Sequence, residues 1–119
     1  MAQNFQPGVF LVFQLEAGFA LLRLLEIEDN GREKTWHVAA YDDFFADVDS
    51  AESATAVPSR LNVTKAHLAL TTRAFESTQV ARLSNLPLTV DELAPMNHWK
   101  TDSESRPSDR SVRLLLGLR

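Results

Sequence analysis

Two apolar segments joined by an Asn-Gly turn constrain the fold of this chain more than any other feature. Residues 18–28 and 33–41 are rich in branched and aromatic side chains, and residues 29–32 between them read Asp-Asn-Gly-Arg. Asn-Gly is typical of a two-residue type I′ turn, because both central positions need positive φ, which glycine reaches freely and asparagine tolerates. The two segments are therefore predicted to form a β-hairpin.

A two-residue turn also fixes which side chains oppose each other across the hairpin. On one face it sets Leu25 opposite Trp36, and on the other it sets Leu24 opposite His37. The same register gives three further pairs: Arg23 with Val38, Leu21 with Ala40 and Ala20 with Tyr41. Both faces are largely apolar, so both must be covered. The hairpin therefore predicts a small β barrel or sandwich.

Length and composition fit a single β-rich domain spanning residues 1–119. A chain of 119 residues with 45 % hydrophobic and 24 % charged side chains can bury a core without metal or disulfide. The absence of cysteine excludes disulfides, thiolate metal sites and a cysteine nucleophile. No segment has a signal-peptide pattern or approaches the roughly 20 apolar residues of a membrane span. A cytoplasmic location without a membrane partner is therefore expected.

Negative charge is concentrated in the first half of the chain. Residues 1–59 carry ten acidic and three basic residues, a net charge of −7, whereas residues 60–119 carry six acidic and nine basic residues, a net charge of +3. No cation occurs between Lys34 and Arg60. Five acids fall within this gap: Asp42, Asp43, Asp47, Asp49 and Glu52. Such a segment repels nucleic acid and attracts a basic protein surface, although an acidic loop can also merely keep a small protein soluble.

Outside the hairpin, the sequence predicts strands and one long loop. A strand is expected over residues 8–14 and a shorter one over residues 79–83. Residues 43–58 lack a steady period and are expected to form a long loop, which can include one helical turn. Residues 67–75 fit a strand, although residues 65–70 also fit a helix.

A capping box marks the start of one short helix. Thr89 at the N-cap and Glu92 three residues later can each accept an otherwise unpaired backbone N–H of the first turn. Pro95 is expected to stop this helix after one or two turns.

The C-terminal residues are apolar in an alternating pattern. Residues 100–111 lack large apolar side chains and are expected to form a mobile loop. Residues 112–119 then place four apolar side chains on one face, which is unfavourable in water. The pattern predicts an edge strand that closes the domain. The alternatives are docking on a partner or on a second copy of the chain, and a disordered end.

Residues that could carry chemistry are few. His37, His67 and His98 lie far apart in the sequence without the spacing of metal ligands, so no metal site, cofactor or catalytic residue is predicted. Trp36 is either a core anchor or an interface hot spot. The alternative to a binding protein is a small ligand-binding or enzymatic barrel that uses one of the histidines with a carboxylate.

Three segments, in order along the chain, carry a family resemblance. Residues 6–12 read Gln-Pro-Gly-Val-Phe-Leu-Val, residues 18–25 read Gly-Phe-Ala-Leu-Leu-Arg-Leu-Leu, and residues 83–88 read Leu-Ser-Asn-Leu-Pro-Leu before an acidic short helix and Pro95. Over roughly residues 6–99, this order resembles the immunity protein 26 family of bacterial polymorphic-toxin systems. The resemblance implies an SH3-like open barrel and a non-enzymatic role in neutralising a cognate toxin. No individual functional residue is carried over from the family.

Together, these observations predict a mainly β (α+β) domain of antiparallel strands with one or two short helices. Its predicted function is to bind another protein. The acidic residues between positions 42 and 52, together with Trp36, are expected to meet the basic surface of that partner.

Overall fold

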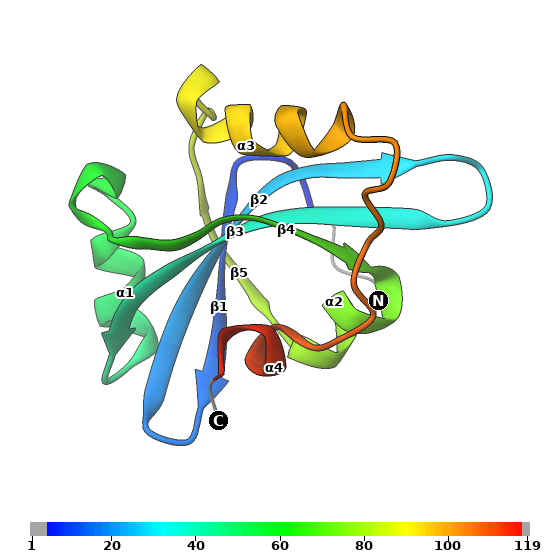
Figure 1. The fold of residues 1–119 in the computed structure, drawn as a ribbon. Coiled ribbons are helices and arrows are strands. Elements are labelled where there is room, and N and C mark those ends of the chain that lie inside the picture. The colour runs from blue at the N-terminus through cyan, green and yellow to red at the C-terminus, as the bar shows by residue number, and fades with distance from the viewer. Residues whose placement is uncertain (1–4, 118–119) are drawn as a thin grey trace.

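The centre of the molecule is an antiparallel sheet of five strands in the order β4-β3-β2-β1-β5 (Figure 1). The structure is a computed structural model that describes residues 5–117. Its strands are β1 (Val9–Leu15), β2 (Gly18–Asp29), β3 (Lys34–Phe45), β4 (Val63–Thr71) and β5 (Ala81–Asn85). Its helices are α1 (Val48–Ala54), α2 (Thr72–Thr78), α3 (Val90–Lys100) and α4 (Val112–Leu116), with a 3-10 turn at Pro58–Arg60. The predicted α+β class is confirmed. A barrel is not confirmed, because β4 and β5 lie at opposite edges of a sheet that does not close within residues 5–117.

Both faces of the sheet are buried, as the two-sided hairpin predicts. On one face, side chains such as Leu22, Leu24 and Val38 belong to a core that α2 and α4 complete through Phe75 and Val112. On the other face, α1 and α3 cover two smaller clusters. Figure 1 shows α3 on the opposite side of the sheet from α2 and α4. A polar side chain between the sheet and a helix therefore needs its own hydrogen-bond partners.

The hairpin turn is longer than predicted. Asp29 pairs with Lys34, which leaves a loop of four residues instead of two. Within this loop only Gly31 has a positive φ, +90°. Asn30 instead uses its side-chain oxygen to accept two backbone N–H groups of the loop. The predicted register is therefore wrong, because asparagine serves here as a hydrogen-bond acceptor and not as a left-handed residue.

A β-bulge in β2 shifts the register again. His37 pairs with Glu26 instead of the predicted Leu24, and Leu25 is the extra residue. The extra residue breaks the usual alternation of side chains between the two faces. Leu25 therefore packs in the cluster beneath α3, and Glu26 also reaches α3, where its carboxylate pairs with Lys100.

Helix α3 begins at the predicted capping box but does not end at Pro95. The Thr89 hydroxyl accepts the Glu92 N–H at 3.1 Å, and the Glu92 carboxylate accepts the Thr89 N–H at 2.9 Å. The helix then continues through the proline to Lys100. Pro95 lacks one helical hydrogen bond, but Met96 directly after it is buried against the sheet. Packing on the sheet thus keeps the second half of the helix in place.

For most of the other elements, the predicted type is correct but the predicted bounds are not. Strand β1 lies within one residue of its predicted bounds, and β5 starts two residues later than expected. Residues 67–75 are a strand only as far as Thr71, after which the chain turns into α2. Part of the expected long loop, residues 43–58, forms α1.

The C-terminal strand predicted for residues 112–119 is wrong, because α4 forms there. Ser111 caps this helix, and Gly117 ends it with φ +69°; residues 118–119 lie outside the described part of the chain. Val112 is fully buried in the core of the α2 face. Before α4, Ser108 exchanges backbone hydrogen bonds with the edge of β4, accepting the Thr71 N–H at 3.0 Å. The mobility expected of residues 100–111 stays a prediction.

Candidate functional site

The acidic segment, defined here as residues 42–52, forms the end of β3 and most of α1. Asp42, Asp49 and Glu52 are exposed. Helix α1 packs on the sheet through Ala51, which is fully buried. The acids predicted to bind a partner therefore lie together at one end of the sheet, where α1 is drawn at the left of Figure 1.

Two of the five acids also stabilise local structure. Asp47 is the N-cap of α1, and its carboxylate accepts the Ser50 N–H at 2.7 Å, which lowers the pKa of Asp47. Asp43 accepts the Asn62 N–H at 2.7 Å and so ties β3 to the start of β4. The remaining three acids form no ion pair within residues 5–117: Asp42, Asp49 and Glu52. Their charges are available to a partner.

Phe44, and not Trp36, is the exposed aromatic residue of β3. The Trp36 side chain is 8 % exposed, stacks on Phe75 with ring centroids 4.1 Å apart, and donates its indole N–H to Thr72. Trp36 is therefore a core anchor, one of the two roles expected from the sequence, and its contact with a partner stays a prediction. Phe44 is 54 % exposed, whereas Phe45 beside it packs against the core. The sequence signal was the Phe-Phe pair, since only one of two adjacent strand residues can face inward.

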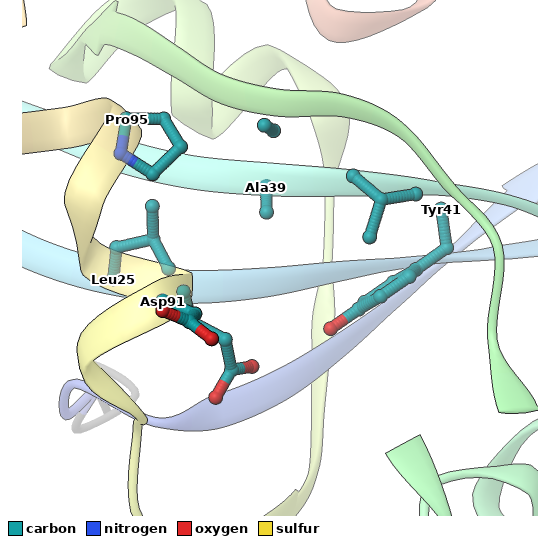
Figure 2. A pocket seen from close by; sticks show the side chains of 8 residues that line it. Leu25, Ala39, Tyr41, Asp91 and Pro95 are labelled. Carbon is teal, nitrogen blue, oxygen red and sulfur yellow. The ribbon is translucent and has the colours of Figure 1, made fainter. Parts of the chain in front are cut away.

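A pocket of about 270 Å³ lies between the sheet and the first half of α3 (Figure 2). Its walls are mostly apolar and include Ala39 and Pro95, while Asp91 and Glu92 supply two carboxylates. Tyr41 also lines the pocket, directly before the acidic segment begins. Burial raises the pKa of Tyr41, so its hydroxyl stays protonated at neutral pH. The pocket can hold an apolar group with a polar or cationic end.

Arg23 occupies the interior next to this pocket and is 1 % exposed. Its guanidinium donates to the carbonyls of Gly8 at 2.9 Å and Leu86 at 2.8 Å, and to the Glu92 carboxylate at 3.2 Å. The guanidinium carbon also lies 4.2 Å from the centre of the Phe10 ring. Because Glu92 is already paired with Arg23, Asp91 is the pocket carboxylate that can meet a ligand. Arg23 itself joins β1, the segment after β5 and α3, which is a structural role.

Under the second half of α3, two histidines form a pair that the sequence did not predict. His37 Nδ1 and His67 Nε2 are 2.8 Å apart, and His37 Nε2 is 2.8 Å from Glu28 Oε1. The two imidazole rings are stacked with centroids 5.0 Å apart, and Trp99 contacts both rings edge-on. His98 is exposed on α3, and its ring takes part in none of these contacts. The chain Glu28–His37–His67 can hold a proton or offer donor atoms to a cation.

His67 is neutral at physiological pH. Burial lowers its pKa, and the charges of His37 and Lys100 lower it further, to about 4. His37 is fully buried, and its Nε2 is covered by the half-exposed Glu28 side chain, so a ligand reaches this nitrogen only when Glu28 moves aside. Sequence reasoning missed the pair because positions 37 and 67 become neighbours only through the pairing of β3 with β4.

Comparison of the chain with models of known families, with curated proteins and with solved structures finds no match. The resemblance to the immunity protein 26 family therefore stays a prediction. Within residues 5–117, none of the helices combines the length and the apolar character needed to cross a membrane.

Proposed function

We propose that this chain is a non-enzymatic, immunity-like binding protein of the cytoplasm, whose acidic segment docks on the basic surface of a partner, such as a toxin that it neutralises. The observation that carries the proposal is Phe44, a phenylalanine that is 54 % exposed among five acids. The proposal extends to an SH3-like open barrel for the fold, supported by five antiparallel strands whose two faces are both buried.

An exposed aromatic ring with a charged surround matches the usual anatomy of an interface. Single exposed apolar residues are normal on any protein surface. Here, however, Phe44 and Val48, which is 39 % exposed, both belong to the acidic segment. No lysine or arginine occurs from position 35 to position 59, which includes this segment. Aromatic residues supply binding energy at the centre of an interface, and charges at its rim guide the encounter. The partner is therefore expected to carry lysines or arginines around an apolar patch.

The pocket beside Tyr41 gives this partner a second point of attachment. Lysine and arginine side chains have apolar stems and charged ends. Such a stem fits the apolar walls at Ala39 and Pro95, while the charged end reaches Asp91. The same pocket supports a second candidate function, the binding of a small amphiphilic cation. This binding would be observed, and would saturate, without any protein partner.

The test neutralises the three acids of the segment whose carboxylates form no ion pair within residues 5–117. The variant Asp42→Asn, Asp49→Asn, Glu52→Gln is compared with Glu16→Gln, Glu76→Gln, Glu104→Gln, which changes three exposed acids elsewhere and shifts the net charge equally. Binding to the protein encoded by the adjacent gene is measured by biolayer interferometry at several salt concentrations. We expect affinity to fall by about tenfold or more in the first variant, mainly through slower association, and the salt dependence to flatten.

The control variant should stay within about twofold to threefold of the wild type, because long-range charge alone contributes little at physiological salt. Equal losses in the two variants would show that net charge matters and the segment does not. Phe44→Ala separates the apolar contribution, with an expected loss of about tenfold and an unchanged salt dependence. Val90→Ala, at a residue that is 84 % exposed, is its matched control.

A further inference from the structure

We propose that Glu26, Glu28 and His37 form a binding site for a divalent first-row transition metal, with Zn²⁺ as the representative ion. One donor atom from each of these three side chains lies within 4.8 Å of the other two. The site is at the second half of α3, under Trp99 and Lys100, and does not depend on the proposed protein-binding function.

The backbone explains why these donors converge. Glu26 and His37 are paired across β2 and β3, and the bulge at Leu25 turns Glu26 toward α3. Glu28 lies two residues further along β2 and therefore on the same face as Glu26, and its Oε1 is 2.8 Å from His37 Nε2. All three donors therefore stand on paired strands, which fixes their mutual position better than a loop would.

His37 is oriented as metal-bound histidines usually are. Its ring is fully buried, stacked on His67 and contacted edge-on by Trp99. Its Nδ1 is hydrogen-bonded to His67 Nε2 at 2.8 Å. Without an ion, the Glu28 carboxylate can only accept, so His37 Nε2 donates to it and His37 Nδ1 accepts from His67 Nε2. When an ion takes the place of the Nε2 proton, His37 carries its proton on Nδ1 and donates it to His67 Nε2. A hydrogen-bond acceptor at the other ring nitrogen fixes the tautomer and orientation of a metal-bound histidine, and His67 Nε2 is in position to be that acceptor.

The distance between the donors leaves room for an ion after a small adjustment. Two ligands of a tetrahedral Zn²⁺ with bonds of about 2.0–2.1 Å lie roughly 3.3 Å apart. His37 Nε2 and Glu28 Oε1 are now 2.8 Å apart, so the gap must widen by only about half an ångström. The Glu28 side chain is 48 % exposed and can make this movement.

The donor set indicates the class of metal. One imidazole nitrogen and two carboxylate oxygens, with no thiolate, suit Zn²⁺, Mn²⁺, Fe²⁺ or Co²⁺ better than Cu⁺ or Ca²⁺. Three protein ligands leave at least one position for water or for a donor from a ligand. The expected stoichiometry is one ion per chain.

Lys100 is the competitor of this metal. Its ammonium pairs with Glu26, and the Lys100 side chain, at the end of α3, is 30 % exposed. A bound cation would have to displace it, because two positive charges cannot share the carboxylate without repulsion. Removing the ammonium should therefore tighten metal binding, an effect that a purely structural ion pair does not predict.

The test titrates the full chain, freed of any polyhistidine tag and treated with EDTA, with Zn²⁺ by calorimetry and with Co²⁺ by visible absorption. We expect one ion per chain. Glu28→Gln should weaken binding by about tenfold or more, whereas Lys100→Gln should tighten it severalfold. His98→Gln, which changes an exposed histidine outside the site, should leave the affinity unchanged.

The proposal is overturned if the wild type binds neither ion at millimolar concentration, or if Glu28→Gln and Lys100→Gln bind like the wild type. Loss of binding in His98→Gln would also overturn it, because the ion would then lie elsewhere. His37→Gln changes a fully buried residue and also perturbs folding, so the decision rests on the two variants at partly exposed positions, whose folding is checked by circular dichroism.

Discussion

Arg23 and His37 are large polar side chains buried near opposite ends of α3, and their hydrogen-bond partners differ in kind. They stand on neighbouring strands, β2 and β3, and are 1 % and 0 % exposed. Arg23 can only donate hydrogen bonds, and acceptors surround it: the Gly8 and Leu86 carbonyls and the Glu92 carboxylate. His37 can donate or accept at either nitrogen, and it lies between a carboxylate and a second histidine.

This difference shows how to tell a buried polar group with a purely structural role from one that can exchange a proton or bind an ion. A guanidinium stays protonated at any physiological pH, so its bonds at the first half of α3 have one possible arrangement. The imidazole pair at the second half can shift its protons or accept a metal ion in their place. Helix α3 thus covers two different polar sites. At its first half lies the anchor, Arg23 with Glu92, whose hydrogen bonds have one arrangement, and at its second half lies the variable end, His37 with His67, whose protons can move.

The largest expected effect is at the anchor. Arg23→Met should lower the free energy of unfolding by about 3–5 kcal/mol, because it leaves the Glu92 carboxylate without its ion-pair partner and removes a hydrogen-bond donor from each of the Gly8 and Leu86 carbonyls. The measurement is urea denaturation at pH 7. Arg110→Met, at an exposed position, is the control and should change stability by less than about 0.5 kcal/mol.

Arg23→Lys sharpens this test. Lysine keeps the charge but lacks the planar fork that reaches three acceptors at once, so its stability should fall between the wild type and Arg23→Met. If Arg23→Lys were as stable as the wild type, charge alone would account for the anchor, and the hydrogen bonds to Gly8 and Leu86 would be dispensable.

The next effect is the pH dependence at the variable end. The pKa of His67 is about 4 in the folded chain and 6.5 without the influence of the fold. Between these values the unfolded chain binds a proton that the folded chain does not, so stability is full above pH 6.5 and falls as the pH drops toward 4. The full shift corresponds to about 3.4 kcal/mol, and solvent screening of this half-exposed ring reduces the expected loss to about 2 kcal/mol.

The measurement compares the wild type with His67→Gln in EDTA from pH 7 to pH 4. Carboxylates titrate in both proteins, so the difference between them isolates His67, which is surrounded by His37, Trp99 and Lys100. The variant should lose less stability on acidification. Parallel curves would contradict the lowered pKa, and His98→Gln should behave like the wild type.

Features encoded in a few adjacent residues were predictable from sequence. The capping box of α3 was found because Thr89 and Glu92 satisfy each other's backbone groups within a single turn. The burial of both hairpin faces followed from apolar side chains at consecutive positions of β2 and β3. Neither conclusion required knowledge of the tertiary structure.

Features that depend on register were not predictable. The four-residue turn and the bulge at Leu25 decide that His37 meets Glu26 instead of Leu24, and nothing in the hairpin's apolar pattern distinguishes the two registers. The His37–His67 pair depends on this shift and on β4. Residues 112–116 alternate in a strand-like way, but Ser111 and Gly117 cap a helix there, and α4 buries Val112 against a core formed by distant strands.

The smallest expected effect tests whether the first half of α3 depends on its anchor. Thr89→Ala removes the N-cap acceptor for the Glu92 N–H and should cost about 1 kcal/mol. The matched change at the other end, Thr101→Ala, removes a hydroxyl that bonds only the His98 carbonyl and should cost about 0.5 kcal/mol or less. Thermal unfolding measures both. If α3 is held chiefly by Arg23 and Glu92, Thr89→Ala is the more destabilising change. Thr89→Ala should also leave the pH dependence of stability that comes from His67 unchanged, because the two ends of the helix act independently. If this variant lost the pH dependence, the two ends would be coupled.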